Sequence, residues 1–385
     1  MAHRSILVSA GEASGDLYAA ALVERLRARL PGTEFFGCAG PQMRRAGVRA
    51  VVDAANVAVV GLFEVLRHIP RVYGEYRKLC RAAEREKPLV AILTDSPDFH
   101  LRLARRLKRR GIPIVYLVAP QVWAWRRGRI PSMRRTIDRL LCIFPFEEEF
   151  FQRHGIPAVY IGHPLSRLVR PSLSKEEFFA THGLDPGRPL VALLPGSRRG
   201  EALRHLPALL AAVERIQQAH PASFVLAAPA GGFLGSDAGG TEIFRERIRG
   251  CPIQLIEGQT WDVLAHAELA LAASGTVTIE AALLGTPMVT FYKVAGLSWW
   301  LGKSLVRVPF YSMVNLVAGQ AIIPELMQNE MSGERLAAEA LRLLSDPAAR
   351  DRMRRDLKGV AARLSGAQDP MERAAGIVAE FLGKP

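Results

Sequence analysis

The sequence contains few cysteines, and their spacing matches neither a disulfide framework nor a zinc-binding motif. The four of them, Cys38, Cys80, Cys142 and Cys251, lie far apart in 385 residues. The absence of a C-x-x-C pair argues against a disulfide framework or a zinc site and fits a reducing compartment. The nine histidines also show no ligand spacing. We therefore expect no structural metal.

Long apolar runs are missing as well. One long uncharged stretch, residues 308–324, is interrupted by Pro309, Asn315 and Gly319 and falls short of a membrane-spanning helix. The first four residues lead directly into an apolar segment, so we expect no signal peptide. If the chain meets a membrane, we expect it to do so from the cytoplasmic surface.

Acidic residues are outnumbered. With 51 Lys and Arg against 37 Asp and Glu, the net charge is +14. Between Leu101 and Arg139 there are twelve basic residues and one acid, Asp138. Such a patch attracts nucleic acid, anionic lipid or a phosphorylated substrate.

The length favours two domains, each with a core of its own. Composition shifts toward Pro, Ser and charged residues between 165 and 189, where we place the linker. We expect a first α/β domain over 1–170, a second over 171–355 and closing helices over 356–385.

The first segment has the order of a βαβ unit: an apolar strand over 5–10, a glycine loop, a helix over 17–30 and a strand over 35–39. The loop matches neither G-x-G-x-x-G nor a Walker pattern, so a dinucleotide or ATP site is weakly supported. Its side chains would lie at the carboxyl edge of the sheet, where open α/β folds bind ligands, although helix capping is an alternative. The loop residues assigned to this edge are Gly11, Glu12, Ser14, Gly15 and Asp16.

Two carboxylates follow the buried strand predicted over 88–94. Asp95 and Asp98 flank a Ser-Pro turn, and a carboxylate held there can act as a general base on a hydroxyl. Helix capping competes with this interpretation. The spacing does not decide between the two, and we prefer Asp95 slightly because it comes first after the strand.

Two further segments combine apolar or aromatic side chains with arginine. Around Trp123 and Trp125, the pair Arg126 and Arg127 can bind an aromatic base or a phosphate, but no RNA-binding motif accompanies them. The stretch 57–73 can contact an anionic bilayer or an acyl chain, or form a core helix with a basic rim. Its residues assigned to membrane or acyl contact are Val59, Leu62, Phe63, Leu66, Arg67 and Ile69.

A second βα series contains two loops suited to phosphate. The first, after a strand over 190–194, offers Gly196 for close backbone approach and Arg198 as a planar fork. The second is the Ser-Gly-Thr turn at 274–276, between a strand over 269–273 and a helix over 277–284. That helix start favours anions, and Glu280, one turn later, can accept hydrogen bonds from a ribose diol. An ordinary βαβ turn with a solvated Glu280 is the alternative.

Six motifs occur together and in order along nearly the whole chain. They are Gly11-Glu-Ala-Ser-Gly-Asp16, Asp95-Ser-Pro-Asp-Phe99, Val122-Trp-Ala-Trp125, Leu194-Pro-Gly-Ser-Arg198, Ser274-Gly-Thr276 with Glu280, and Asn315-Leu-Val-Ala-Gly319. The set closely resembles the lipid-A-disaccharide synthase family of inverting GT-B glycosyltransferases.

The resemblance implies two Rossmann-like domains facing across a cleft, with the C-terminal helix crossing back to the first. Members join UDP-2,3-diacylglucosamine to 2,3-diacylglucosamine 1-phosphate through a β-1,6 bond and release UDP, in lipid A biosynthesis. The resemblance further implies a peripheral enzyme on the cytoplasmic face of the inner membrane, with no nucleic-acid partner and no metal. It implies no cofactor, because the UDP-sugar is a substrate. A homodimer is a further expectation.

Site roles carried over by the resemblance divide between the domains. The first domain would bind the acceptor, and Asp95 or Asp98 would take the proton of its 6-hydroxyl. Arg198 and the helix dipole would stabilise the leaving UDP. The residues expected to bind the UDP-sugar are Gly196, Ser197, Arg198, Gly258, Ser274, Gly275, Thr276, Glu280, Asn315 and Gln320.

Two alternatives stay open at this point. UDP-sugar 2-epimerases share the two-domain architecture but act on a soluble sugar, so detergent dependence of activity would separate them from the transferase. A basic membrane-binding or RNA-binding protein would explain the charge but leave both phosphate loops without a purpose.

Overall fold

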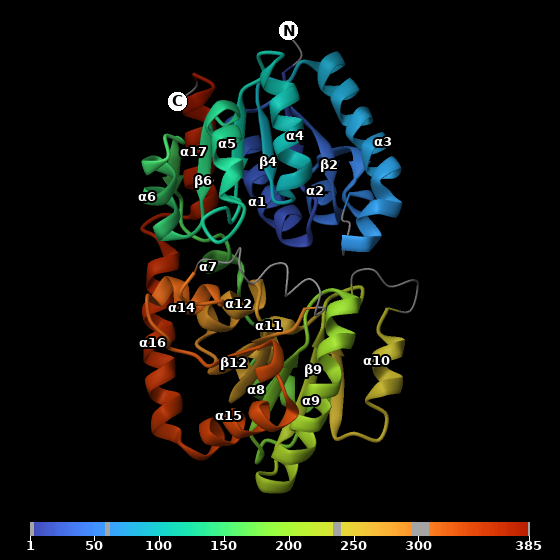
Figure 1. The fold of residues 1–385 in the computed structure, drawn as a ribbon, viewed down its shortest axis with the longest axis vertical. Helices are drawn as coiled ribbons and strands as arrows, with labels where there is room; N and C mark the ends of the chain where they lie inside the picture. Colours follow the sequence, from blue (N-terminus) through green and yellow to red (C-terminus); the bar gives the residue numbers. More distant parts are fainter. Residues whose placement is uncertain (1–3, 58–61, 234–239, 295–307, 384–385) are drawn as a thin grey trace. The chain divides into compact units, whose positions relative to one another are not determined.

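The computed structural model describes residues 4–57, 62–233, 240–294 and 308–383, with the side chains of 62–69 left out. The chain forms two compact units. The first comprises Met1–Pro164 and Leu364–Pro385, and the second Leu165–Arg363. Each is a parallel sheet with helices on both faces (Figure 1).

Within the described residues, the first unit has a seven-stranded sheet of order β3-β2-β1-β4-β5-β6-β7. Its central strands are continuous apolar runs because helices cover both of their faces. The strands are β1 Ser5–Ser9, β2 Glu34–Ala39, β3 Arg49–Asp53, β4 Ala91–Thr94, β5 Ile114–Leu117, β6 Arg139–Cys142 and β7 Ala158–Tyr160.

Except for the C-terminal helix α17, the helices of this unit lie between successive strands, as in other doubly wound folds. Their bounds are α1 Ala13–Arg29, α2 Pro41–Arg45, α3 Leu62–Glu86, α4 Pro97–Lys108, α5 Ile130–Thr136, α6 Pro145–Arg153 and α17 Pro370–Phe381, with short 3₁₀ turns η1 Ala54–Asn56 and η2 Arg127–Arg129.

The C-terminal helix α17 packs on α1, which confirms that the end of the chain returns to the first domain. The contact buries small apolar side chains of α17, among them Ala374 and Val378. At its edge, Arg25 Nε lies 3.0 Å from Glu372 Oε1 and Arg29 Nη2 lies 2.9 Å from Glu372 Oε2.

The described part of the second unit has a six-stranded parallel sheet of order β10-β9-β8-β11-β12-β13. The strands are β8 Leu190–Leu194, β9 Ser223–Ala228, β10 Ile253–Glu257, β11 Leu269–Ala273, β12 Met288–Tyr292 and β13 Glu325–Met327. The helices are α7 Leu165–Leu168, α8 Lys175–His182, α9 Arg199–Ala219, α10 Glu242–Arg247, α11 Thr260–His266, α12 Thr276–Leu284, α14 Met313–Ala318, α15 Gly333–Ser345 and α16 Pro347–Ser365, with the 3₁₀ turn η3 Gln328–Glu330.

Strand order reverses once in each sheet, and the reversal decides where ligands can bind. In the first unit β1 pairs with both β2 and β4, and in the second β8 pairs with both β9 and β11. At such a switch point the loops leaving the two central strands diverge and leave a crevice at the carboxyl edge. The loops after β1 and β4 therefore border one such crevice in the first unit, and the loops after β8 and β11 border another in the second unit.

Most of the segment 57–73, which we predicted to contact lipid, lies outside the residues or side chains that the structure describes. Val59 lies outside the described residues, and so do the side chains of Leu62, Phe63, Leu66, Arg67 and Ile69, whose backbone forms the first turns of α3. Farther along α3, Tyr73 is exposed and stacks on Tyr76. Among the helices that the structure describes, none is both long and apolar enough to cross a membrane.

Candidate active site

In the first unit, the Asp95 carboxylate is held against the loop that follows β1. The backbone N–H of Gly11 donates to Asp95 Oδ1 at 2.8 Å, and that of Glu12 donates to Oδ2 at 3.0 Å. A Cβ atom on Gly15 would lie 1.7 Å from Asp95 Oδ2, and one on Gly11 would lie 2.4 Å from Ser96 Oγ. Both glycines are therefore required for the two loops to approach so closely.

The backbone of Asp95 is strained and is held by side chains from other elements. Asp95 and the next residue, Ser96, have φ values of 52° and 34°, in the left-handed region that non-glycine residues adopt at a cost of about 1–3 kcal/mol each. The Asp95 carbonyl accepts hydrogen bonds from Tyr116 Oη at 2.6 Å and from His100 Nδ1 at 3.0 Å. These bonds join β4, β5 and α4 at the point of strain.

His100 acts here as a neutral, fixed donor. Its ring is fully buried, and this burial lowers its pKa to about 4. Because a carbonyl can only accept, the single ring proton sits on Nδ1, and Nε2 accepts from Ser9 Oγ at 2.7 Å. Ser9 ends β1, so the imidazole ties the two central strands together beneath the loop.

Burial raises the pKa of Asp95 to about 8, and the nearby Glu12 charge adds to the effect. The two backbone N–H donors and the Ser96 side chain partly offset it, because they stabilise the ionised form. The result is a carboxylate that is more basic than an exposed one and fixed in position.

Asp98 has the opposite environment. It lies in the first turn of α4, its side chain is 69% exposed, and it pairs with Arg126 and Arg129. Arg126 Nη1 is 2.9 Å from Asp98 Oδ2. The two carboxylates that the sequence left undecided thus differ sharply: Asp95 is enclosed by donors at the switch point, whereas Asp98 is a surface group with compensated charge.

The other predicted residues of the first loop separate into two kinds. Asp16 is buried, and its carboxylate accepts from the backbone N–H of Gly40, Gln42 and Met43 at 2.9, 2.8 and 3.2 Å. It therefore anchors the loop between β2 and α2. Glu12 is exposed at the N-cap of α1, and Ser14, predicted to lie in the loop, is half-buried in the first turn of that helix.

In the second unit, the loop after β8 is clamped by a histidine that sequence reasoning missed. His205, fully buried in α9, makes a 2.7 Å hydrogen bond from Nδ1 to Pro195 O and accepts at Nε2 from the Lys293 N–H at 3.1 Å. Burial lowers its pKa. The sequence shows His205 only as a histidine on the apolar face of a predicted helix. That pattern does not reveal its hydrogen bonds to the backbone of Pro195 and Lys293.

The residues after this clamp begin α9. Gly196 has a φ of 117°, and a Cβ there would lie 2.6 Å from Glu201 Oε2. Ser197 is exposed and Arg198 half-buried at the N-cap of α9. The neighbouring loop after β11 begins α12 at Gly275, where no side chain in the described part of the chain caps the helix. Two helix starts with outward N–H groups thus stand on adjacent strands, an arrangement suited to a diphosphate.

Glu280 lies on α12 one turn beyond Thr276. Burial raises the pKa of its carboxyl to about 7, opposed by a hydrogen bond from the Trp261 side chain. Ser274 is half-buried, while Gly275 and Thr276 are exposed at the helix start. The carboxylate and the helix start are therefore on one element, as the spacing predicts.

Three predicted donor-site residues lie farther from these loops along the fold. Asn315 is buried: its Oδ1 accepts from the N–H of Ile322 and Ile323, and its Nδ2 donates to Ile323 O and Glu325 Oε1. All of its bonding capacity thus shapes the segment around Gln320, which is exposed. Gly258, with a φ of 78°, follows the edge strand β10.

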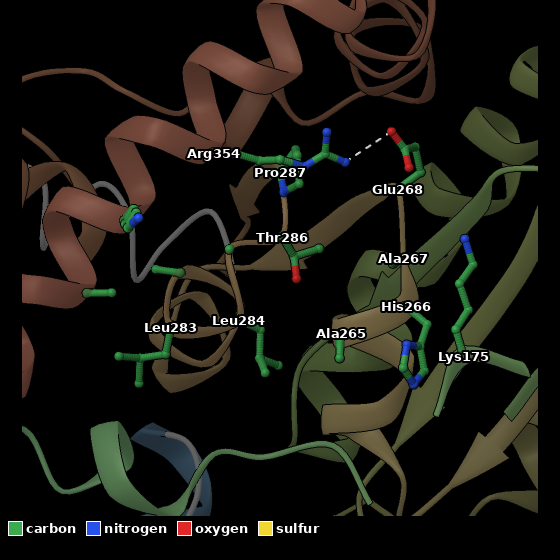
Figure 2. Close-up of a pocket in the computed structure, with 14 residues that line it drawn as sticks. Lys175, Ala265, His266, Ala267, Glu268, Leu283, Leu284, Thr286, Pro287 and Arg354 are labelled. Atoms are coloured by element: carbon green, nitrogen blue, oxygen red, sulfur yellow. Dashed lines mark hydrogen bonds and ion pairs between the residues drawn. The ribbon is translucent and has the colours of Figure 1, made fainter. Parts of the chain in front are cut away.

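The second unit also has a pocket of about 470 Å³ (Figure 2), whose lining includes none of the residues of these two loops. Its wall is formed by residues 265–268 and 282–287, which lead into the amino ends of β11 and β12, and by α16. Glu268 at its edge pairs with Arg350 and Arg354, with nitrogen–oxygen distances of 2.7 and 3.0 Å. The pocket thus opens at the opposite edge of the sheet from the helix starts.

Comparison with known proteins identifies the relatives of this fold. A family model described as lipid-A-disaccharide synthetase matches residues 6–375. The lipid-A-disaccharide synthase of Solibacter usitatus is 63% identical over 377 residues, covering 98% of this chain and 97% of that protein. The synthase of Koribacter versatilis is 43% identical, with 96% of each chain covered.

Solved structures with this fold are more distant in sequence. The UDP-GlcNAc 2-epimerase of Neisseria meningitidis, bound to UDP-GlcNAc, superimposes with a TM-score of 0.65 at 12% identity, over 99% of this chain and 100% of that one. The calicheamicin glycosyltransferase CalG4 gives 0.59 at 18% identity, over 100% and 99%. At such identities the likeness establishes the GT-B fold alone.

Proposed function

The chain belongs to the lipid-A-disaccharide synthase family, whose members are glycosyltransferases of lipid A biosynthesis, and from that premise we propose a role for each unit. The first unit binds the diacylglucosamine 1-phosphate acceptor, and the second binds UDP-diacylglucosamine. The assignment is supported by the chemistry of the two switch points, a fixed basic carboxylate in one and two open helix starts in the other.

Asp95 is the general base of this proposal. Its carboxylate takes the proton of the acceptor 6-hydroxyl as that oxygen forms a bond to the anomeric carbon of the donor. The bond from that carbon to the β-phosphate oxygen breaks at the same time, and its electron pair leaves with UDP. A single in-line displacement inverts the anomeric configuration.

Asp95 is preferred to Asp98 because of its environment. Its pKa is raised to about 8, which makes it a better proton acceptor, and both oxygens are fixed by N–H donors. Asp98 already interacts with two guanidinium groups. This contrast between the two carboxylates is the observation that carries the proposal.

The donor diphosphate is assigned to the starts of α9 and α12. Arg198 and the N–H groups of Gly275 and Thr276 stabilise the charge that grows on the leaving UDP. Glu280 accepts hydrogen bonds from the ribose. Gly196 and Ser197 let the backbone approach the phosphates, while Asn315 supports the segment that presents Gln320.

The test is acceptor-dependent UDP release in neutral detergent by the wild type, Asp95→Asn and Asp98→Asn. We expect Asp95→Asn to lower kcat by about 10²–10⁴-fold, the usual contribution of a general base, with UDP affinity unchanged. Asp98→Asn should lower kcat by less than about tenfold. A larger loss in Asp98→Asn would reassign the base, and release of UDP without acceptor would contradict the transferase mechanism.

Peripheral attachment to the cytoplasmic face of the inner membrane is part of the same proposal. It is supported by the basic patch over 101–139, in which Arg102 is exposed on α4 and Arg109 is exposed at the C-cap of that helix, and by the exposed Tyr73 on α3. Cosedimentation with phosphatidylglycerol vesicles should exceed that with phosphatidylcholine vesicles and weaken with salt. Equal binding to both vesicles would contradict it. Analytical ultracentrifugation would test the homodimer that the family resemblance suggests.

A further inference from the structure

Two arginines are fixed beside the proposed base by a carboxylate and an indole. Arg126 Nη1 is 2.9 Å from Asp98 Oδ2 and 3.3 Å from Oδ1, and Arg129 Nη2 also contacts Oδ1. The Arg126 guanidinium carbon lies 4.4 Å from the centre of the Trp125 ring, and that of Arg129 lies 6.0 Å from it. We name these four residues the arginine cluster.

The arginine cluster carries excess positive charge that solvent can reach. It has two guanidinium groups and a single carboxylate, and the side chains of Arg126 and Asp98 are 43% and 69% exposed. A guanidinium has five N–H donors. The hydrogen bonds seen among the described residues use one terminal nitrogen of each arginine. Further donors therefore remain on Arg126, whereas the Arg129 side chain is only 17% exposed.

The backbone presents Arg126 in a way that ordinary surface arginines lack. Arg126 has a φ of 56°, in the left-handed region, at the turn that leads into η2. Its guanidinium is then held between the Trp125 ring and the Asp98 carboxylate. A fork that is already immobilised loses less entropy when it binds an oxyanion.

The arginine cluster belongs to the same edge of the sheet as Asp95. Asp98 lies three residues after Asp95, in the first turn of α4, and the arginines follow β5, the strand paired with β4. Burial raises the pKa of Tyr116, with the Asp95 charge adding and the Arg129 charge opposing. Since Tyr116 Oη donates to the Asp95 carbonyl at 2.6 Å, the Arg129 charge acts close to the base.

We propose that Arg126 and Arg129 bind the phosphate of the acceptor, and that this contact directs the acceptor hydroxyl to Asp95. The inference rests on the proposed function. In a sugar 1-phosphate, the phosphate and the 6-hydroxymethyl group stand on the two carbons that flank the ring oxygen. One acceptor molecule can therefore present both groups to the edge of the sheet where Asp95 and the arginine cluster lie. Paired arginine forks suit a phosphate because they donate to two of its oxygens at once.

Trp125 and Asp98 are positioning residues in this scheme. The indole face stabilises the cation and orients its plane, while the carboxylate holds both forks in register before substrate arrives. This assigns a role to the exposed aspartate of the Asp-Ser-Pro-Asp motif and to the exposed tryptophan of the Trp-Ala-Trp motif. The other tryptophan, Trp123, is buried and donates from Nε1 to Glu147 Oε1 at 3.0 Å.

The experiment compares kcat/KM for diacylglucosamine with and without its 1-phosphate, the acyl chains being equal, in neutral detergent without anionic lipid. Removing the phosphate should lower kcat/KM of the wild type by about 10- to 100-fold, since hydrogen bonds to charged groups are worth about 1.5–3 kcal/mol. In Arg126→Gln/Arg129→Gln this ratio should fall to near 1, because the loss affects only the phosphorylated acceptor.

The matched control is Arg77→Gln/Arg81→Gln, which removes the same charge from exposed positions on α3. It should retain the wild-type ratio, and UDP binding should be unchanged in both variants. An unchanged ratio in Arg126→Gln/Arg129→Gln would overturn the inference while leaving the proposed function intact. A wild type that releases no UDP with either acceptor would instead contradict the proposed function.

Discussion

The two switch points of this protein share a topology and differ in chemistry. In the first unit the crevice is occupied by a carboxylate, held by backbone donors and supported by buried Ser9, His100 and Tyr116. In the second unit it is bordered by two helix starts with outward N–H groups. One fold thus provides either a proton acceptor or an anion site, depending on whether the N–H groups are satisfied by the chain itself.

Among changes to the surroundings of Asp95, the largest expected effect comes from removing the space that its carboxylate needs. Gly15→Ala places a methyl group 1.7 Å from the present position of Asp95 Oδ2, so the carboxylate must move. We expect kcat to fall by about 10²-fold, the usual result of displacing a catalytic group by about 1 Å, with UDP affinity unchanged. Calorimetric UDP titration and UDP-release kinetics measure the two quantities.

Gly74→Ala is the matched control for this change. Gly74 is also a helical glycine of the first unit, and nothing lies within 4 Å of its added Cβ. It should keep full activity and increase the free energy of unfolding by about 0.5–1 kcal/mol. A Gly15→Ala enzyme with normal kcat would show that Asp95 does not need its observed position.

The next effect concerns the strain at Asp95. Tyr116→Phe removes one of the two hydrogen bonds on its carbonyl and should lower kcat by up to about tenfold, since one such bond is worth about 0.5–1.5 kcal/mol. His100→Asn, which can still donate from the position of Nδ1, should retain more activity than His100→Gln, which reaches toward Ser9 instead. The reverse order, measured as kcat, would contradict the assigned tautomer and role of His100.

A smaller effect is expected in the pH profile. A general base must be ionised, and the pKa of Asp95 is raised to about 8, so kcat/KM for the acceptor should rise with pH through about 8 and fall about tenfold per pH unit well below it. Glu12→Gln removes a negative charge that raises this pKa. The rise should therefore move to lower pH, giving a few-fold higher rate at pH 7. Glu24→Gln, an exposed position on the same helix, should leave the profile unchanged.

The smallest effect belongs to the second unit. Burial raises the pKa of Glu280 to about 7, and only its ionised form accepts two ribose hydroxyls. UDP affinity should therefore increase a few-fold from pH 6 to pH 8, with a proton released on binding. Trp261→Phe removes the hydrogen bond that lowers this pKa and should move the increase to higher pH. Calorimetry in buffers of different ionisation enthalpy measures the number of protons released on UDP binding. If no proton is released, the proposed contact between Glu280 and the ribose is wrong.

Local pattern was sufficient to predict much of this architecture. The apolar run 269–273 coincides with β11, the helix expected from 277 begins at Thr276, and the phosphate loops follow neighbouring strands. These features depend on residues close together in sequence. The family resemblance supplied the expectation that the last helix returns to the first unit, and α17 on α1 confirms it.

The unpredicted features depend on contacts between distant segments. That Asp95 and not Asp98 is enclosed follows from where α4 begins and from the pairing of β1 with β4. The partners of His100 and His205 are backbone groups of other elements, and no spacing rule reports them. The edge strand β3 has exposed residues and little alternation, so it gave a weak signal.

The return of α17 to the first unit has a consequence for biosynthesis. The second unit is one uninterrupted stretch of chain, but the first is complete only when residues 364–385 have been made. Domains generally begin to fold in the order of their synthesis, so α1 waits, with its apolar face uncovered, until the whole second unit has emerged. Premature termination near the end of the message would therefore leave a complete second unit and a first unit without α17, whose uncovered apolar face makes it prone to aggregation.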